Sequence, residues 1–131
     1  MAVPAGISER ATERSSYSYW DGRAWTTELT RAALAVPGST SGFSVSYNDH
    51  LRAYLAFSSR GFSNAVDLRV AAQPEGPWTD PLQVYRFPSA IYATHQHDAL
   101  DADGGRRVFV SAFRDLGNFR GEIKLLEVTF E

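Results

Sequence analysis

The sequence predicts an all-β, propeller-like protein, and three observations carry this prediction. Short segments of alternating apolar and polar residues recur along the chain, and turn residues such as Gly, Pro, Asn and Asp separate them. No segment longer than two helical turns has a helical period. A strand–turn–strand–loop–strand unit occurs twice, at Phe43–Val70 and at Gln96–Thr129, at about the 40–50-residue spacing of propeller blades.

The chain begins with a loose arm and a hairpin. Residues 1–14 are polar and weakly patterned, so we expect the arm there. The opening hairpin is expected at 15–36, where two aromatic segments flank Asp21-Gly22. Gly accepts the positive φ that a type I′ turn requires, which makes Asp-Gly a strong hairpin signal. Residues 30–36 fit either a short helical turn or a strand.

A four-stranded blade is predicted at 43–87. Its first strand alternates strictly, with Ser44 and Ser46 on one face, and such small residues suit the innermost strand of a blade, where strands converge. They either contact a ligand with their hydroxyls or simply fit the crowded axis. The four predicted strands are Phe43–Tyr47, Leu51–Ser58, Val66–Val70 and Leu82–Arg86.

The last blade is predicted at 94–131, with strands at Gln96–Leu100, Arg107–Arg114 and Glu122–Phe130. Residues Arg107–Arg114 are apolar on both faces. Blades are covered on both sides by their neighbours, whereas a two-sheet sandwich keeps one polar face. The pattern therefore favours blades, and the sandwich remains the alternative.

Composition excludes several classes of function. The net charge of −2 gives no basic face for nucleic acid or for a membrane surface. The chain has no cysteine, so disulfides and thiolate metal sites are excluded. No apolar run is long enough to span a bilayer. The start, Met1–Gly6, lacks the pattern of a signal peptide, and the sequence leaves the compartment open.

Four motifs carry a resemblance to a known family. They are Tyr19-Trp20-Asp21-Gly22-Arg23-Ala24-Trp25, Phe43-Ser44-Val45-Ser46-Tyr47-Asn48, Ala71-Ala72-Gln73-Pro74-Glu75-Gly76-Pro77-Trp78-Thr79, and His97-Asp98-Ala99-Leu100 before Asp103-Gly104-Gly105. In this order they resemble the C-terminal part of a five-bladed propeller family of unknown function. That family is similar to the family-43 glycosidase and arabinanase-like superfamily, and its members are secreted or periplasmic.

The resemblance implies a carbohydrate-associated module. In the resembled glycosidases the catalytic carboxylates lie mainly on earlier blades, and only a late-blade histidine near a central ion or water has a match here, His97. Where the family has Pro and Glu after this histidine, the chain has Asp98 and Ala99. The resemblance therefore implies sugar or ion binding rather than catalysis by this chain alone, with His97 and Ser44/Ser46 at the channel.

The candidate ligand-binding residues are His97, His95, Ser44, Ser46 and Tyr92. Alternate residues on a strand share a face, so His95 and His97 point the same way, and Tyr92 offers a ring that can stack on a sugar. For a metal the candidates are His97 and Asp98. No cofactor follows firmly, because the loop at Asp101 lacks the length and the later carboxylates of a calcium-binding loop. Calcium is the one ion kept open.

Two further carboxylates and the assembly complete the predictions. Asp49 and Asp67 are the remaining catalytic candidates, and Asp67 is expected to pair with Arg52 or Arg69.

Two to three blades cannot close a ring and would expose apolar faces. We therefore expect a homo-oligomer or association with the remainder of a propeller. The alternative function is a non-catalytic, self-associating interaction module, or a propeller fragment without independent activity.

Overall fold

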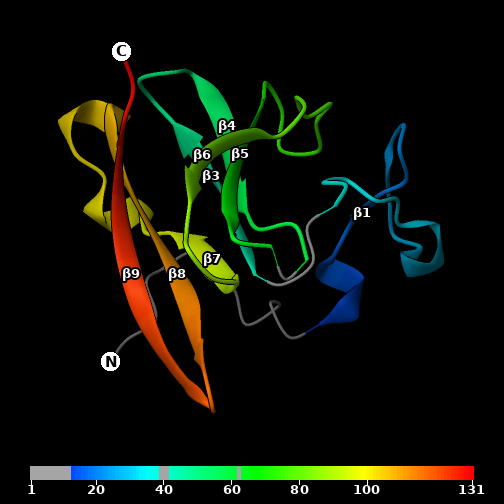
Figure 1. Ribbon diagram of the computed structural model, residues 1–131. Coiled ribbons are helices and arrows are strands. Elements are labelled where there is room, and N and C mark those ends of the chain that lie inside the picture. Colours follow the sequence, from blue (N-terminus) through cyan, green and yellow to red (C-terminus); the bar gives the residue numbers. More distant parts are fainter. Residues whose placement is uncertain (1–12, 39–41, 62) are drawn as a thin grey trace, which may run out of the picture. The chain divides into compact units, whose positions relative to one another are not determined.

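The computed structural model describes residues 13–38, 42–61 and 63–131, and its regular structure there consists of strands and short 3₁₀ helices (Figure 1). Contacts divide the chain into two units, Met1–Ala35 and Val36–Glu131. The strands are β1 Tyr19–Trp20, β2 Trp25–Thr26, β3 Phe43–Asn48, β4 Ala53–Ser58, β5 Ala65–Ala71, β6 Leu82–Arg86, β7 Ile91–Gln96, β8 Arg107–Gly117 and β9 Arg120–Thr129. The 3₁₀ helices are η2 Arg14–Ser16, η3 Leu29–Arg31, η4 Asp98–Leu100 and η5 Asp103–Gly105. Across the described ranges, no helix has the length and apolar character needed to cross a membrane.

Strands β1 and β2 form the predicted opening hairpin in the first unit, and η3 follows them. The predicted arm at 1–14 lies almost entirely outside the described residues. Trp20 pairs with Trp25, so residues 21–24 make a four-residue loop, and the predicted two-residue turn is wrong. The cause is Asp21, whose carboxylate accepts hydrogen bonds from the backbone N–H groups two and three residues further on. Arg31 holds the same carboxylate in an ion pair of 2.7 Å.

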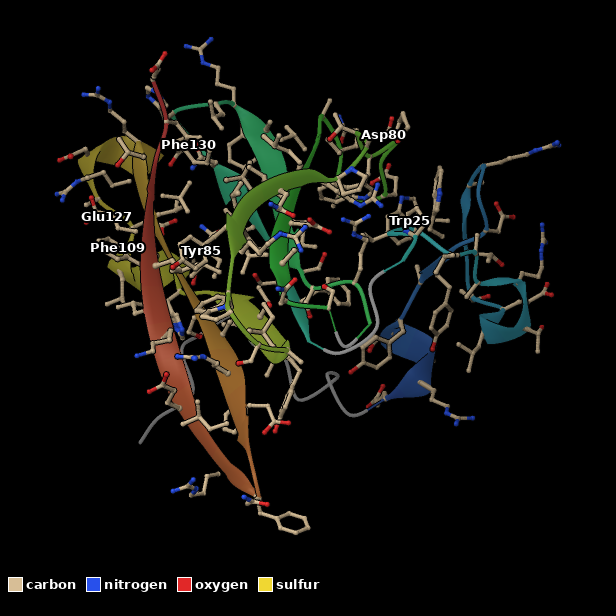
Figure 2. The ribbon with its side chains drawn as sticks, viewed as in Figure 1. Trp25, Asp80, Tyr85, Phe109, Glu127 and Phe130 are labelled. Carbon is tan, nitrogen blue, oxygen red and sulfur yellow. The ribbon has the colours of Figure 1, made fainter. Side chains whose placement is uncertain are left out.

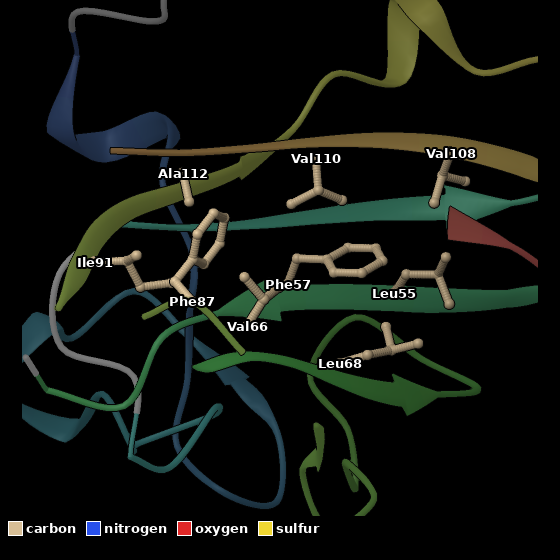
Figure 3. Close-up of a cluster of buried hydrophobic side chains, with 9 residues drawn as sticks. All are labelled: Leu55, Phe57, Val66, Leu68, Phe87, Ile91, Val108, Val110 and Ala112. Atoms are coloured by element: carbon tan, nitrogen blue, oxygen red, sulfur yellow. The ribbon is translucent and has the colours of Figure 1, made fainter. Parts of the chain in front are cut away.

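The second unit contains two antiparallel sheets, one of four strands in the order β3-β4-β5-β6 and one of three in the order β7-β8-β9. The sheets face each other across a core of nine buried side chains (Figure 3). These are Leu55, Phe57, Val66, Leu68, Phe87, Ile91, Val108, Val110 and Ala112. The sheets come closest where β7 lies against β3 and β4. Two sheets that converge at their first strands form the all-β, propeller-like arrangement that the sequence predicts.

The three-stranded sheet is shaped by a bulge and a tight turn. In β7 the register shifts between Tyr92 and His95, and Ala93 between them has φ +55°. Gly42 passes close to this bulge, since a Cβ atom there would lie 2.6 Å from the Cα of Ala93. The β8–β9 turn consists of Asn118 and Phe119, both with positive φ, which is the type I′ pattern.

One predicted strand is wrong. The segment Gln96–Leu100 is not a strand, because β7 runs from Ile91 to Gln96 and Asp98–Leu100 forms η4. The last blade therefore begins at Ile91 rather than at 94. The bulge at Ala93 breaks the two-residue alternation by which the strand would have been recognised. The other predicted strands of both blades are present, with ends that differ by a few residues.

Candidate functional site

The predicted residues Ser44 and Ser46 join the two sheets. The backbone N–H of Gln96 donates to Ser44 Oγ at 2.6 Å, and Ser46 Oγ donates to Gln96 Oε1 at 2.8 Å. Gln96 Nε2 in turn donates to Asp101 Oδ2 at 2.6 Å. Gln96 and Ser44 are buried, and the bond between them is shielded from water, whereas the bonds to Ser46 and Asp101 are partly buried. The small residues of β3 thus form a polar seam against β7, and their hydroxyls are occupied within the protein.

The seam opens into a polar cleft of about 320 Å³ between the β3–β4 turn and the β7–β8 connection. Asp49, Asp98 and Asp101 supply its carboxylates, and Tyr47 supplies its ring. Burial raises the pKa of the Asp101 carboxyl above its ordinary value, partly offset by hydrogen bonds from Gln96 and a backbone N–H, while the nearby Asp98 raises it further. The cleft is therefore acidic, and one of its carboxylates is poorly solvated.

The two predicted histidines lie together on the other side of β7, on the outer face of the three-stranded sheet. Their ring centroids are 5.3 Å apart with the rings nearly perpendicular. His97 Nε2 lies 2.8 Å from Ser111 Oγ on β8, and His95 pairs with the same serine across the strands. The prediction that His95 and His97 point the same way is confirmed. They do not meet Ser44 or Ser46, which belong to the seam.

Tyr92 lies on this outer face and borders a hollow of about 510 Å³, which we call the hairpin hollow. Its ring and that of Phe113 are 4.6 Å apart at 34°. Phe119, at the tip of the β8–β9 turn, is fully exposed and supplies a third ring. The lining of the hollow is Tyr92, Phe113, Asp115, Gly117, Asn118, Phe119 and Arg120.

The outer face continues along β8 and β9 beyond the hollow. Figure 2 shows Phe109 and Glu127, which pair across these strands, on the left-hand side of β9 and away from the four-stranded sheet. Ile123 and Leu125 on β9 are largely exposed on the same face. The outer face therefore offers aromatic, apolar and imidazole groups together.

The two residues predicted for a metal, His97 and Asp98, have separate partners within the fold. The imidazole contacts Ser111, and the Asp98 carboxylate accepts the backbone N–H of Ala99 at 3.0 Å. Within residues 13–38, 42–61 and 63–131, no group of three or more His, Cys, Asp or Glu side chains is arranged to hold an ion.

The remaining carboxylate candidates lie apart. Asp67 is buried in β5, and its Oδ2 lies 2.6 Å from Nε of Arg60, so the predicted pairing with Arg52 or Arg69 is wrong. The loop after β4 brings Arg60 back over β5, a contact that strand alternation does not reveal. Asp49 is in the turn at the opposite end of β4. The two carboxylates therefore do not form a pair.

Sequence reasoning missed Gln96 and the residues of the hairpin tip. Gln96 lies between two candidate histidines, and strand alternation would have placed it on the opposite, inner face. Asn118 is a residue that tolerates positive φ, and its place between two apolar strands was the available signal for a tight turn. The contribution of Phe119 had no signal in the sequence.

Comparison with known proteins assigns a family and no activity. A search of curated proteins finds no match to the chain. A family model described as a domain of unknown function, DUF4185, matches residues 7–115, which is most of the chain. That description names no ligand and no reaction. By this match the chain belongs to the DUF4185 family of domains of unknown function.

Proposed function

We propose that the protein is a carbohydrate-associated β-propeller module that binds a sugar in the hairpin hollow. The resemblance of its sequence motifs to glycosidase-like propellers favours a sugar over other ligands. Tyr92, predicted as the ligand-facing aromatic, lines this hollow, with His95 and His97 further along the same face. Sugars present apolar C–H faces and polar hydroxyl edges, and the hollow offers partners for both.

Aromatic rings form one side of the proposed site. Tyr92 and Phe113 pack against each other in a tilted arrangement with ring centroids 4.6 Å apart, which holds both rings in place before a ligand arrives. Preorganised groups lose little entropy on binding. The volume of about 510 Å³ lies within the range of small-ligand sites, about 300–1,000 Å³.

The strained and exposed conformation of Phe119 is the observation that carries the proposal. Its φ is +58°, and its ring is fully exposed. A left-handed conformation costs a residue other than Gly about 1–2 kcal/mol, and the second position of a type I′ turn favours Gly. The ring gains no burial in return within the described protein. A ligand that stacks on it would supply the contact that the fold lacks.

Polar side chains border the rings and suit binding rather than hydrolysis. Asp115, Asn118 and Arg120 present acceptors and donors at the edge of the hollow. Glycoside hydrolysis uses two carboxyl groups set apart around the scissile bond, whereas Asp115 is the single carboxylate in the lining that the structure describes. The proposal is therefore a binding site.

The test is titration of the protein with a panel of arabinose, xylose, glucose and galactose oligosaccharides, monitored by calorimetry. We expect at least one oligosaccharide to bind, and Phe119→Ala and Tyr92→Ala each to weaken its binding about tenfold, as loss of about 1.4 kcal/mol of ring contact implies. His97→Ala tests whether the ligand extends to the histidines.

Phe43→Ala is the matched control, since Phe43 is a half-exposed aromatic residue on β3 in the other sheet. The sugar affinity of the Phe43→Ala variant should equal that of the unmodified protein. Failure of every sugar in the panel to bind, or equal affinity for Phe119→Ala and Phe43→Ala, would refute the hollow as a sugar site.

A further inference from the structure

Strand β9 presents an open edge of ten residues, Arg120–Thr129. It is the last strand in the order β7-β8-β9, and no strand of the described chain pairs with its second edge. Edge strands that stay single are usually short, or carry charged side chains, a proline or a bulge. β9 has no proline, its central charges at Glu122 and Lys124 are of opposite sign, and the register irregularity of its pairing with β8 lies at the start of the turn, between Asp115 and Gly117. The edge therefore remains competent to pair.

The outer face of β9 is apolar at its centre. Ile123 is 74% exposed and Leu125 is 56% exposed. Next to them Gly121 lies beneath the ring of Phe113, because a Cβ atom at this glycine would overlap the ring. The Phe113 ring therefore fills the space above Gly121, and a side chain from a neighbouring strand would contact the edge of this ring.

We propose that β9 pairs with β9 of a second copy of this chain, antiparallel about a two-fold axis at Ile123, so that two three-stranded sheets become one of six strands. This goes beyond the sugar site, which lies at the turn. Such a two-fold axis is perpendicular to the sheet and keeps each face on its own side, so each strand meets its copy around one central residue.

Charge selects the register. Centred on Ile123, the pairing sets Glu122 of each copy opposite Lys124 of the other. Centred on Lys124 it would oppose two like charges, and centred on Leu125 it would oppose Ile123 with Glu127. Opposite charges across strands stabilise and like charges destabilise. Glu122 and Lys124 contact each other and are both partly exposed, 34% and 45%, so a neighbouring strand can reach both, although Glu122 also pairs with Arg114.

The same register matches shape on the outer face. Ile123 meets its own copy at the axis, and Leu125 of one copy lies opposite Gly121 of the other, beside the ring of Phe113. Ile123 is thereby covered, and Leu125 of each copy packs against the edge of the Phe113 ring that covers Gly121 of the other. Apolar and charged pairs favour a single register, which limits slippage.

Cross-linking tests the axis directly. The chain has no cysteine, so Ile123→Cys creates one thiol that can link only to its copy. Directly opposed residues in antiparallel strands have Cβ atoms about 4.5–5.5 Å apart, within reach of a disulfide or a short bis-maleimide. We expect a covalent dimer on a non-reducing gel. Leu82→Cys is the control, because Leu82 is similarly exposed on β6, the edge strand of the other sheet, and should stay monomeric.

Charge exchange tests the register. Lys124→Glu alone and Glu122→Lys alone each oppose like charges and should weaken dimerisation about tenfold or more. Mixed together, the two variants restore two opposite-charge pairs and should form a heterodimer, measured by size-exclusion chromatography with light scattering. Glu122→Lys also loses an ion pair with Arg114, so its melting curve is recorded first. If it does not fold, cross-linking decides.

Three results would overturn the proposal. The first is a protein that remains monomeric at all concentrations. The second is equal cross-linking of Ile123→Cys and Leu82→Cys. The third is a dimer that neither charge variant weakens, because such a dimer uses a different surface.

Discussion

The two faces of the β7–β8–β9 sheet carry similar side chains in very different surroundings. On β8 the inner residues Val108, Val110 and Ala112 are completely buried. The alternating outer residues, Phe109 and Phe113, are as apolar but only partly covered. Hydrophobicity alone therefore does not decide which face of a strand enters the core. The difference separates two roles: the inner face stabilises the fold, and the outer face is where we place the sugar site.

The largest expected difference between the faces is in stability. Phe57→Ala empties the centre of the core and should lower the free energy of unfolding by about 3–5 kcal/mol. Phe113→Ala removes a partly covered outer ring that contacts Tyr92 and Gly121, and it should cost about 1 kcal/mol. Urea denaturation of both variants measures the comparison. Equal losses would mean that the outer face is as much a core as the inner one.

The polar seam is the second test, because it joins the sheets at the inner face. Gln96→Leu removes the bonds to Ser46 Oγ and Asp101 and leaves those partners partly buried without them. The expected cost is about 2–3 kcal/mol, measured by thermal or urea denaturation. Gln83→Leu on the exposed β6 strand is the control and should change stability little. A Gln96→Leu variant with unchanged stability would show that apolar packing alone orients the sheets.

The pH dependence of stability is a third and smaller effect. Burial raises the pKa of Asp101 in the folded protein, so its ionisation is harder in the folded than in the unfolded chain. Below the pKa that Asp101 has in the unfolded chain, its carboxyl is protonated in both states and does not lower the stability. As the pH rises through the higher pKa of the folded protein, the carboxyl destabilises the fold increasingly. Relative to Asp101→Asn, the unmodified protein should lose stability as the pH is raised above the ordinary aspartate pKa of 3.8. Urea denaturation of both proteins at each pH gives the difference, and an opposite sign would contradict the assignment.

The smallest effect is expected at the tip of the outer face. Phe119→Gly relieves a left-handed conformation and should raise the free energy of unfolding by about 0.5–1 kcal/mol. The same change removes a ring from the hairpin hollow, so it should lower sugar affinity while stabilising the fold. Denaturation and calorimetry on one sample separate the two. Loss of stability would show that the ring contributes to folding.

Much of the fold was predictable, because it follows from local alternation. The segments 43–47, 66–70, 82–86 and 107–114 lie in strands as expected. The error at Gln96–Leu100 arose where a bulge at Ala93 interrupts the two-residue period. For the candidate site, the common orientation of His95 and His97 was predictable from alternation. Their separation from Ser44 and Ser46 was not, since it depends on which face of β7 meets β3.

By itself, the sequence determined the all-β class, most of the strands and the pairs of residues that share a strand face, because these depend on neighbours within a few residues. Only the tertiary structure decided which of two apolar faces is buried, which serines form hydrogen bonds with Gln96 and which aromatic rings surround a hollow. These depend on contacts such as that of Ser46 with Gln96, fifty residues apart. Alternation within a strand fixes that two faces exist, and the packing of one sheet on another fixes what each face meets.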